Sequence, residues 1–261
     1  MYTEFIPNIE LIIVFLLGLS FGSFATLVSY RLPRGEDIVF TPSRCPSCSR
    51  RLGFFDLFPV ISWAFNKGKC AHCDVKVSAR YPLIELSMGL AFVLVYDRFG
   101  ISPAGGVLLL LTVCLVIIIV TDLEHTIIPD KIQVVMVVLG IIYRLLPDSY
   151  SPIQIIVGPA VAVSFGLVLR YIFTKWKEVE ALGLGDVKFL ITIGLFLDQE
   201  LFISFLFLSG ILGIITSLIW RKKDQDRHFP FGPALAITLY FCVVMPEMQE
   251  LVRQYIFSMV L

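Results

Sequence analysis

Two aspartates set among apolar residues are the side chains best suited to chemistry in this sequence. Asp122 lies at the end of an apolar run, in T-D-L-E-H-T-I-I-P-D, and Asp186 follows two glycines in G-L-G-D-V-K. An ionisable side chain within an apolar span is energetically costly and is therefore a functional candidate. Two neighbouring carboxyl groups in such a site can share one proton, which prepares general acid–base hydrolysis of an amide. The same pair would also suit a proton-coupled transporter, so both classes stay open from these residues alone.

The residues around the two aspartates suggest supporting roles. The glycines before Asp186 remove side chains, so that a neighbouring helix or an extended substrate backbone can approach closely. Glu124 and Asp130 share the first motif, and Asp130 directly follows Pro129, which predicts that it caps the next helix. Lys188 is a candidate counter-charge for Asp186.

Four cysteines in one polar stretch predict a metal site. Cys45 and Cys48 form one Cys-x-x-Cys pair, and Cys70 and Cys73 form a second pair after 21 intervening residues. Four thiolates can close a tetrahedron around Zn²⁺ and leave no position for water, so the predicted role is structural. Two disulfides are the alternative, which a reducing cytoplasmic setting would disfavour.

Three further residues of metal-binding type are predicted to have other roles. His72 could replace one cysteine as a ligand, but we expect it to face solvent or to lie beside the metal site. Cys114 and Cys242 fall within apolar runs and are predicted to be small packing residues.

The elements that carry these residues are predicted to be membrane helices. Of the 261 residues, 57% are hydrophobic and the mean hydropathy is +0.86, which is too apolar for a soluble domain. Backbone polar groups in lipid must be satisfied within each segment, so the fold class is predicted to be all-α, a polytopic membrane protein with about eight transmembrane helices. These are expected at about residues 9–30, 83–98, 103–121, 131–147, 153–173, 181–198, 201–220 and 231–245.

The distribution of basic residues predicts the orientation in the membrane. Nine Lys and Arg lie between Arg31 and Arg80, and the remaining clusters fall in alternate loops, which indicates that these loops are cytoplasmic and both termini are outside. Lys plus Arg and Asp plus Glu both total 21, so no charge excess indicates a nucleic-acid partner. The predicted organisation is a first helix at 1–30, a cytoplasmic zinc-binding domain at 31–82, and a transmembrane domain with the aspartate pair at 83–261.

The order and spacing of several motifs resemble the type IV prepilin peptidases, a family of GxGD aspartyl membrane proteases. The residues that carry this resemblance are G22-S-F, R31-L-P, R44-C-P-S-C, K69-C-A-H-C, R80-Y-P-L-I-E-L, D122-L-E-H-T-I-I-P-D, G183-L-G-D-V-K and P230-F-G-P.

The resemblance implies an enzyme of the bacterial inner membrane. Such an enzyme cleaves the leader of type IV prepilins or type II secretion pseudopilins after a glycine, on the cytoplasmic side. It then methylates the new N-terminus with S-adenosylmethionine. By motif, Asp122 and Asp186 would be the catalytic pair, the four cysteines would bind the metal, and Asp130 would match a recurrent acid of the family.

One position departs from the family's pattern. The first span reads G-S-F-A-T, with Thr26 where the family usually has asparagine, and this bears on methylation more than on cleavage. The sequence contains no Rossmann-type glycine motif after a strand, so residues for S-adenosylmethionine are not identified. A non-enzymatic, zinc-containing assembly factor for a secretion machine is a third class that the sequence leaves open.

Overall fold

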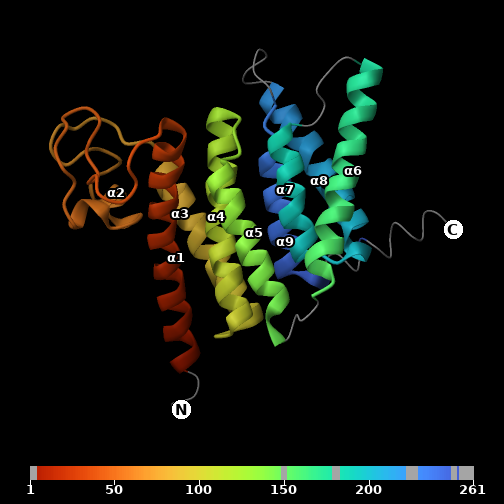
Figure 1. The fold of residues 1–261 in the computed structure, drawn as a ribbon. Coiled ribbons are helices and arrows are strands. Elements are labelled where there is room, and N and C mark those ends of the chain that lie inside the picture. The colour runs from red at the N-terminus through yellow and green to blue at the C-terminus, as the bar shows by residue number, and fades with distance from the viewer. Residues whose placement is uncertain (1–4, 148–151, 178–182, 222–228, 248–251, 253–261) are drawn as a thin grey trace. The chain divides into compact units, whose positions relative to one another are not determined.

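The computed structural model describes residues 5–147, 152–177, 183–221, 229–247 and 252 (Figure 1). Within these ranges the regular structure is helical, and the only β-type pairings are two isolated bridges. The predicted all-α fold class is therefore confirmed for the described part of the chain. The chain divides into two compact units, residues 1–105 and 106–261.

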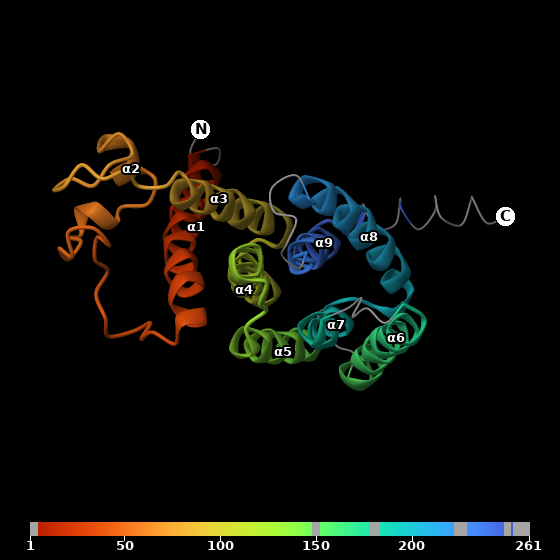
Figure 2. The same ribbon diagram turned by 90° about the horizontal axis from the view of Figure 1, so that it is seen from above.

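The first unit consists of two long helices and the loop between them. Helix α1 spans Phe5–Arg31 and α3 spans Arg80–Phe99, and the two lie side by side (Figure 2). Glycine permits this close packing, because a Cβ added at Gly18 would lie 2.7 Å from the Cα of Gly89. The loop contains two short 3-10 turns, η1 and η2, and the short helix α2, with bounds Leu32–Arg34, Phe55–Leu57 and Ile61–Phe65.

In its described residues the second unit contains six helices, and α7 packs against α5, α6 and α9. Helix α4 begins at the boundary between the units and is largely buried, with Leu108, Leu115 and Ile118 almost inaccessible to solvent. The bounds are Pro103–His125 for α4, Asp130–Leu145 for α5, Gln154–Lys177 for α6, Leu184–Phe196 for α7, Gln199–Arg221 for α8 and Gly232–Val244 for α9.

Each of the eight predicted spans coincides with a helix, but the helices differ in length. In the described part of the chain, four are long and apolar enough to cross a membrane: Ile9–Arg34, Pro103–His125, Gln154–Trp176 and Gln199–Trp220. Helices α5, α7 and α9 are shorter, with 16, 13 and 13 residues. The count of eight spans and the orientation therefore stay predictions. Most basic residues of the loop after α8 (Lys222, Lys223 and Arg227) lie outside the described residues.

Helix α7 begins later than the sequence predicted. We expected it to start near Ala181, because a full crossing would need about 20 residues. Ala181 itself lies outside the described residues, but Gly183 is extended, with φ −63° and ψ 150°, and α7 begins at Leu184. The expectation was wrong because the carboxylate of Asp186 accepts the N–H of Gly183, which places the cap of α7 at Gly183.

The far end of α7 is held by a buried arginine from α5. The Nε of Arg144 donates a hydrogen bond to the carbonyl of Leu195 at 2.6 Å, and its Nη1 lies 3.0 Å from a carboxylate oxygen of Asp198. Arg144 is 5% exposed. A guanidinium at the C-terminus of a helix satisfies carbonyl groups that have no partner within that helix. Arg144 therefore fixes α7 relative to α5.

Replacing Arg144 with leucine should destabilise the second unit. The loss of a buried, charge-assisted hydrogen bond predicts a destabilisation of about 2 kcal/mol, seen as a lower Tm. Asp198→Asn is the matched control: the Asp198 side chain is 57% exposed, so its ion pair should contribute much less. Equal Tm values for Arg144→Leu and the unsubstituted protein would contradict the role given to Arg144.

Candidate functional site

Asp122 lies in the last turn of α4 and is 5% exposed. Its Oδ2 accepts a hydrogen bond from the backbone N–H of Gly232 at 2.8 Å. Gly232 is the first residue of α9, so the carboxylate meets the positive end of that helix. A Cβ at position 232 would lie 2.7 Å from the same oxygen, so a residue other than glycine would displace the carboxylate.

Asp186 lies in the first turn of α7. Its Oδ2 accepts a hydrogen bond from the backbone N–H of Gly183 at 3.2 Å, and Gly183 is the residue that caps α7. A carboxylate at this position satisfies one of the amide groups that have no partner at a helix start. Both aspartates are thus held by amides at helix N-termini, Asp186 at α7 and Asp122 at α9.

The two aspartates lie close enough in the folded chain to interact electrostatically. The charge of Asp122 acts on the carboxyl group of Asp186, although 63 residues separate them in sequence. The structure thereby brings together the pair that the sequence singled out. Two adjacent carboxyl groups in a site of low polarity cannot easily both ionise, so the arrangement suits a shared proton.

The turn between α4 and α5 contacts the glycines before Asp186. Helix α4 ends at His125, and Thr126 adopts a left-handed conformation with φ 53°. Two residues on, the Cβ of Ile128 would lie 3.4 Å from a Cβ added at Gly185. This would be an ordinary van der Waals contact, so the turn packs directly on the start of α7 and helps to set where Asp186 lies relative to α4.

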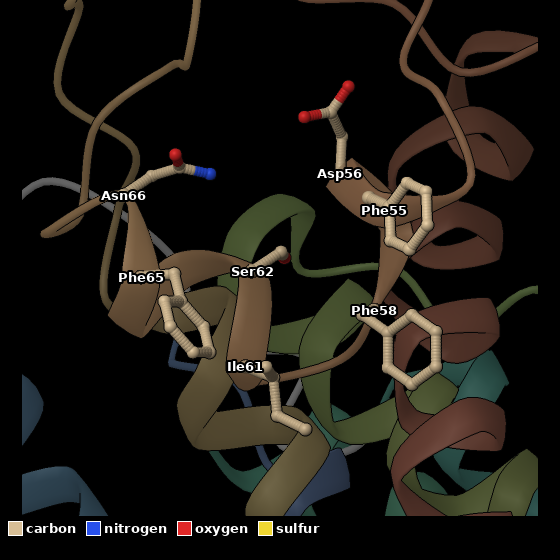
Figure 3. A pocket seen from close by; sticks show the side chains of 7 residues that line it. All are labelled: Phe55, Asp56, Phe58, Ile61, Ser62, Phe65 and Asn66. Carbon is tan, nitrogen blue, oxygen red and sulfur yellow. The ribbon is translucent and has the colours of Figure 1, made fainter.

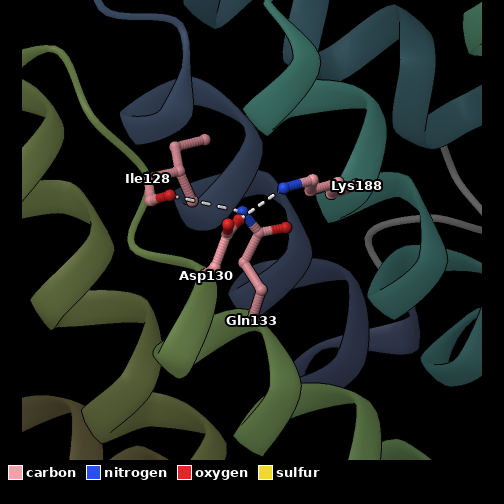
Figure 4. A network of polar contacts seen from close by, with 4 residues as sticks. All are labelled: Ile128, Asp130, Gln133 and Lys188. Atoms are coloured by element: carbon pink, nitrogen blue, oxygen red, sulfur yellow. Dashed lines mark hydrogen bonds and ion pairs between the residues drawn. The ribbon is translucent and has the colours of Figure 1, made fainter.

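An ion pair crosses the same contact (Figure 4). The Nζ of Lys188 lies 2.7 Å from Oδ1 of Asp130, and Gln133 donates to the carbonyl of Ile128 at 3.4 Å. Two expectations are corrected here. Asp130 is the first residue of α5 and makes no capping hydrogen bond, because Pro129 occupies the cap position. Lys188 pairs with Asp130 rather than with Asp186, whose carboxylate faces the amide of Gly183.

The four cysteines lie at the tips of two matching hairpins in the first unit. The first hairpin is closed by a bridge between Arg44 and Arg51, and the second by a bridge between Lys69 and Lys76. In each, the amide of the residue after the second cysteine donates to the carbonyl of the first, at 2.9 and 3.1 Å. That residue is left-handed in both hairpins, with φ 57° and 54°. The two Cys-x-x-Cys pairs thus share one backbone geometry.

The sulfur atoms of Cys45, Cys48, Cys70 and Cys73 fit a tetrahedral metal ion. They all lie within 4.8 Å of one another, and the Sγ atoms of Cys45 and Cys73 are 3.8 Å apart. A zinc ion with Zn–S bonds of about 2.3 Å requires sulfur atoms about 3.8 Å apart. Amide groups of Cys48 and Ser47 donate to the Cys45 sulfur and lower the pKa of Cys45 to about 6, whereas burial and the neighbouring thiols raise the pKa of Cys73 to about 12.

The structure also places the remaining cysteines and the histidine. All six cysteines are free thiols, so the structure does not contain the two alternative disulfides. His72 is exposed and is not part of the sulfur cluster. Cys114 and Cys242 are buried in α4 and α9.

Comparison with known families matches both units. Residues 16–99 match the bacterial peptidase A24 N-terminal domain, and residues 109–218 match the type IV leader peptidase family. Three relatives are described as prepilin leader peptidase/N-methyltransferase. The relative from Myxococcus xanthus is 32% identical over 88% of this chain and 72% of its own length. The chain belongs to the prepilin leader peptidase/N-methyltransferase family.

Two other relatives support the same assignment. Those from Neisseria gonorrhoeae and Stutzerimonas stutzeri are 30% and 29% identical, and each alignment covers 85% of this chain and 86% of the relative. Comparison with solved structures gives no match. The resemblance drawn from the motifs is thus confirmed, and so is the prediction that the protein is an enzyme, a peptidase. The four cysteines fall within the N-terminal match and both aspartates within the peptidase match.

Sequence reasoning missed the role of Gly232. The P-F-G-P motif was noted only as part of the family resemblance, yet its glycine donates the hydrogen bond to Asp122. A Pro-flanked glycine at the start of an apolar run was the available signal, since it marks a helix N-terminus whose amides lack partners. Its partner Asp122 lies 110 positions earlier in the chain, and no local pattern links the two.

Replacing Gly232 with alanine should impair peptidase activity by displacing Asp122. A methyl group 2.7 Å from Oδ2 must shift the carboxylate, and a displacement of about 1 Å can cost about 100-fold in rate. Gly210→Ala in α8 is the matched control, because a Cβ there meets nothing within 4 Å. Steady-state cleavage assays on both variants check this, and full activity of Gly232→Ala would contradict the positioning role.

Reversing the Asp130–Lys188 pair should test the contact between the α4–α5 turn and α7. Both side chains are more than half exposed, so each single change, Asp130→Lys or Lys188→Asp, should lower kcat/KM only about two- to fivefold. The double exchange should restore most of the loss. Lys131→Asp, beside the pair, is the control. Unaltered activity in both single variants would show that this ion pair does not matter to the site.

Proposed function

We propose that this enzyme cleaves the N-terminal leader of type IV prepilins or type II secretion pseudopilins after glycine, at the cytoplasmic face of the bacterial inner membrane, using Asp122 and Asp186 as its catalytic pair. The observation that carries the proposal is the pairing of these two carboxyl groups, each held by an amide at a helix N-terminus. Relatives that align with 85% and 88% of this chain and are named prepilin leader peptidase/N-methyltransferase support the substrate class.

In the proposed mechanism one proton is shared by the two carboxyl groups. The ionised member takes a proton from a water molecule as that water attacks the peptide carbonyl. The protonated member stabilises the developing oxyanion and then protonates the leaving amine. The pair titrates as a unit, so these two roles belong to the pair and are not divided between Asp122 and Asp186.

The geometry around the pair supports an extended substrate backbone. The glycines before Asp186 carry no side chains, and Gly183 itself is extended. A prepilin presents an apolar N-terminal helix that must fray near the bond to be cut, and the glycine before that bond favours fraying. The substrate's apolar segment would remain in lipid while its leader lies in water.

The metal that we propose for the cysteine cluster is zinc, in a structural role. With four thiolate ligands the ion has no open position for a substrate or a water molecule. It would hold the two hairpins together in a loop that has little hydrophobic core of its own. No step of peptide hydrolysis is assigned to it.

The second activity that we propose is methylation of the new N-terminus with S-adenosylmethionine as methyl donor. The names of the relatives support it. The described helices form no strand-based dinucleotide fold, and no residue is assigned to the donor. Thr26 is buried in α1, and its hydroxyl donates to the carbonyl of Ser23 at 2.7 Å.

Asparagine at either aspartate should abolish cleavage of a prepilin. Asp122→Asn and Asp186→Asn keep the side-chain size and can still accept the hydrogen bonds from Gly232 and Gly183, but they cannot share a proton. The expected loss is at least about 1,000-fold, since each removes both acid and base function from the pair. Gel or mass analysis of purified enzyme with prepilin measures it.

Controls separate this outcome from misfolding and from other functions. Both variants should keep the metal content and Tm of the unsubstituted protein. Full cleavage by either variant would contradict the catalytic assignment. If cleavage were absent from the unsubstituted protein but proton flux in liposomes depended on Asp186, a transporter would replace the peptidase. Normal pilus assembly with both asparagine variants would indicate a non-enzymatic assembly factor.

Metal analysis tests the zinc assignment. The purified protein should contain about one zinc per chain, the stoichiometry of a four-cysteine site. Exchange of Cys45 and Cys48 for serine should lower that content and destabilise the loop, whereas Cys114→Ser should leave the zinc content unchanged. Full zinc content in the double serine variant would show that the ion lies elsewhere.

A further inference from the structure

The loop of the first unit carries a cluster of exposed aromatic side chains. Phe54, Phe55 and Phe65 are 74, 83 and 84% exposed. Phe54 packs edge-to-face on Phe55 and Phe58, with ring centroids 5.8 and 5.4 Å apart. Phe54, Phe55, Phe58, Phe65 and Ile61 together form the aromatic patch. A groove of about 330 Å³ lies within it (Figure 3). An exposed apolar surface of this kind marks an interaction site.

A hydrogen bond fixes the patch beside helix α3 rather than beyond its end. The N–H of Val60, just before α2, donates to Oε2 of Glu85 at 2.7 Å. Glu85 is five residues into α3, about 7.5 Å along the helix axis from its start. Leu83 and Leu90, on either side of that level, are 64 and 65% exposed. The patch is therefore held at the height of the apolar outer surface of α3.

The backbone is strained at Val60, the residue through which the loop is attached to Glu85 of α3. Val60 has φ 60° and ψ −49°, and the N–H of Ile61 donates to the carbonyl of Pro59. This is the rare, strained form of the γ-turn, and a β-branched residue seldom adopts it. Such a conformation persists only where its surroundings enforce it. Glu85, which is 6% exposed, supplies that constraint through the Val60 amide.

Other residues at the same end of the two long helices are typical of a membrane interface. The guanidinium of Arg34 lies 3.8 Å from the ring centroid of Tyr30 on α1, and that of Arg80 lies 5.8 Å from the ring of Tyr81 on α3. Tyrosine and basic residues gather where hydrocarbon meets headgroups. Residues 31–82 contain nine basic and four acidic side chains, so the loop complements an anionic surface.

The groove itself is polar on one side and apolar on the other. Figure 3 shows the side chains of Asp56 and Asn66 at one rim, and Phe58 and Ile61 towards the opposite end. Asp56 also accepts the N–H of Gly53 at 2.9 Å, which holds it at the polar rim. A segment with this division of polar and apolar groups is suited to a boundary between water and hydrocarbon.

We propose that the aromatic patch is inserted into the boundary between headgroups and acyl chains of an anionic phospholipid bilayer, so that residues 54–65 anchor the metal-binding loop on the membrane surface. The hydrogen bond to Glu85 holds the patch beside the apolar outer surface of α3, and the loop is positively charged. Both features favour lipid, rather than the apolar segment of a protein substrate, as the partner of the patch. The anchor fixes the height of the two cysteine hairpins above the hydrocarbon.

Quenching by brominated lipids tests this proposal in the full-length protein. The background carries Trp176→Phe and Trp220→Phe and keeps Trp63, whose indole donates to the carbonyl of Val77 at 3.0 Å. Phe55→Trp and Phe65→Trp are the two reporters. Ser47→Trp, in the first hairpin, is the control. Each protein is placed in nanodiscs of phosphatidylcholine and phosphatidylglycerol, with bromine on the acyl chains near the headgroups.

Both reporters should lose about half of the added tryptophan fluorescence, because an interfacial segment lies about 5–10 Å deep, whereas Ser47→Trp should lose little. Quenching should be weaker in discs of phosphatidylcholine alone. The absence of quenching at both reporters, or equal quenching at position 47, would overturn the proposal. Burial of the reporters that appeared only after a prepilin peptide was added would overturn it in favour of a substrate-binding surface. Unchanged metal content and Tm show that each variant is folded.

Discussion

The structure of the second unit depends on two carboxylates that meet the N-termini of two helices. Asp186 satisfies the amide of Gly183 at the start of α7, and Asp122 satisfies the amide of Gly232 at the start of α9. In each case the carboxylate accepts a hydrogen bond from an amide that has no partner within its helix. The hydrogen bond therefore fixes the position of the acid and the start of the helix together. Two further contacts hold α7 in position. Arg144 fixes the far end of α7, and Ile128 packs on Gly185 at its near end.

The first unit must hold in place a polar loop that has little hydrophobic core. Two hairpins of the same backbone geometry bring four sulfur atoms within 4.8 Å of one another. A buried glutamate, Glu85, joins the same loop to α3 through a strained turn. The loop is thus tied at the proposed metal and at the helix, and its exposed phenylalanines are left facing outward.

The sequence predicted those parts of the molecule whose physical signal is local. The apolar runs gave the helices, the Cys-x-x-Cys spacing gave the sulfur cluster, and acids within apolar runs gave Asp122 and Asp186. It did not predict that α7 begins at Leu184, because that start depends on how Gly183 and Asp186 pair in the folded chain. The sequence also did not predict contacts between residues that lie far apart along the chain. Asp122 with Gly232, Lys188 with Asp130, and Arg144 with Leu195 are examples, and each joins residues more than 50 positions apart.

The pH dependence of prepilin cleavage is the most direct test of a shared proton on Asp122 and Asp186. The purified enzyme in nanodiscs, assayed at saturating prepilin across the range where it stays folded, should give a bell-shaped profile of kcat, because activity requires one carboxyl group ionised and the other protonated. A rate that rises or falls in one direction only, with no second limb, would mean that the two acids do not act as a pair.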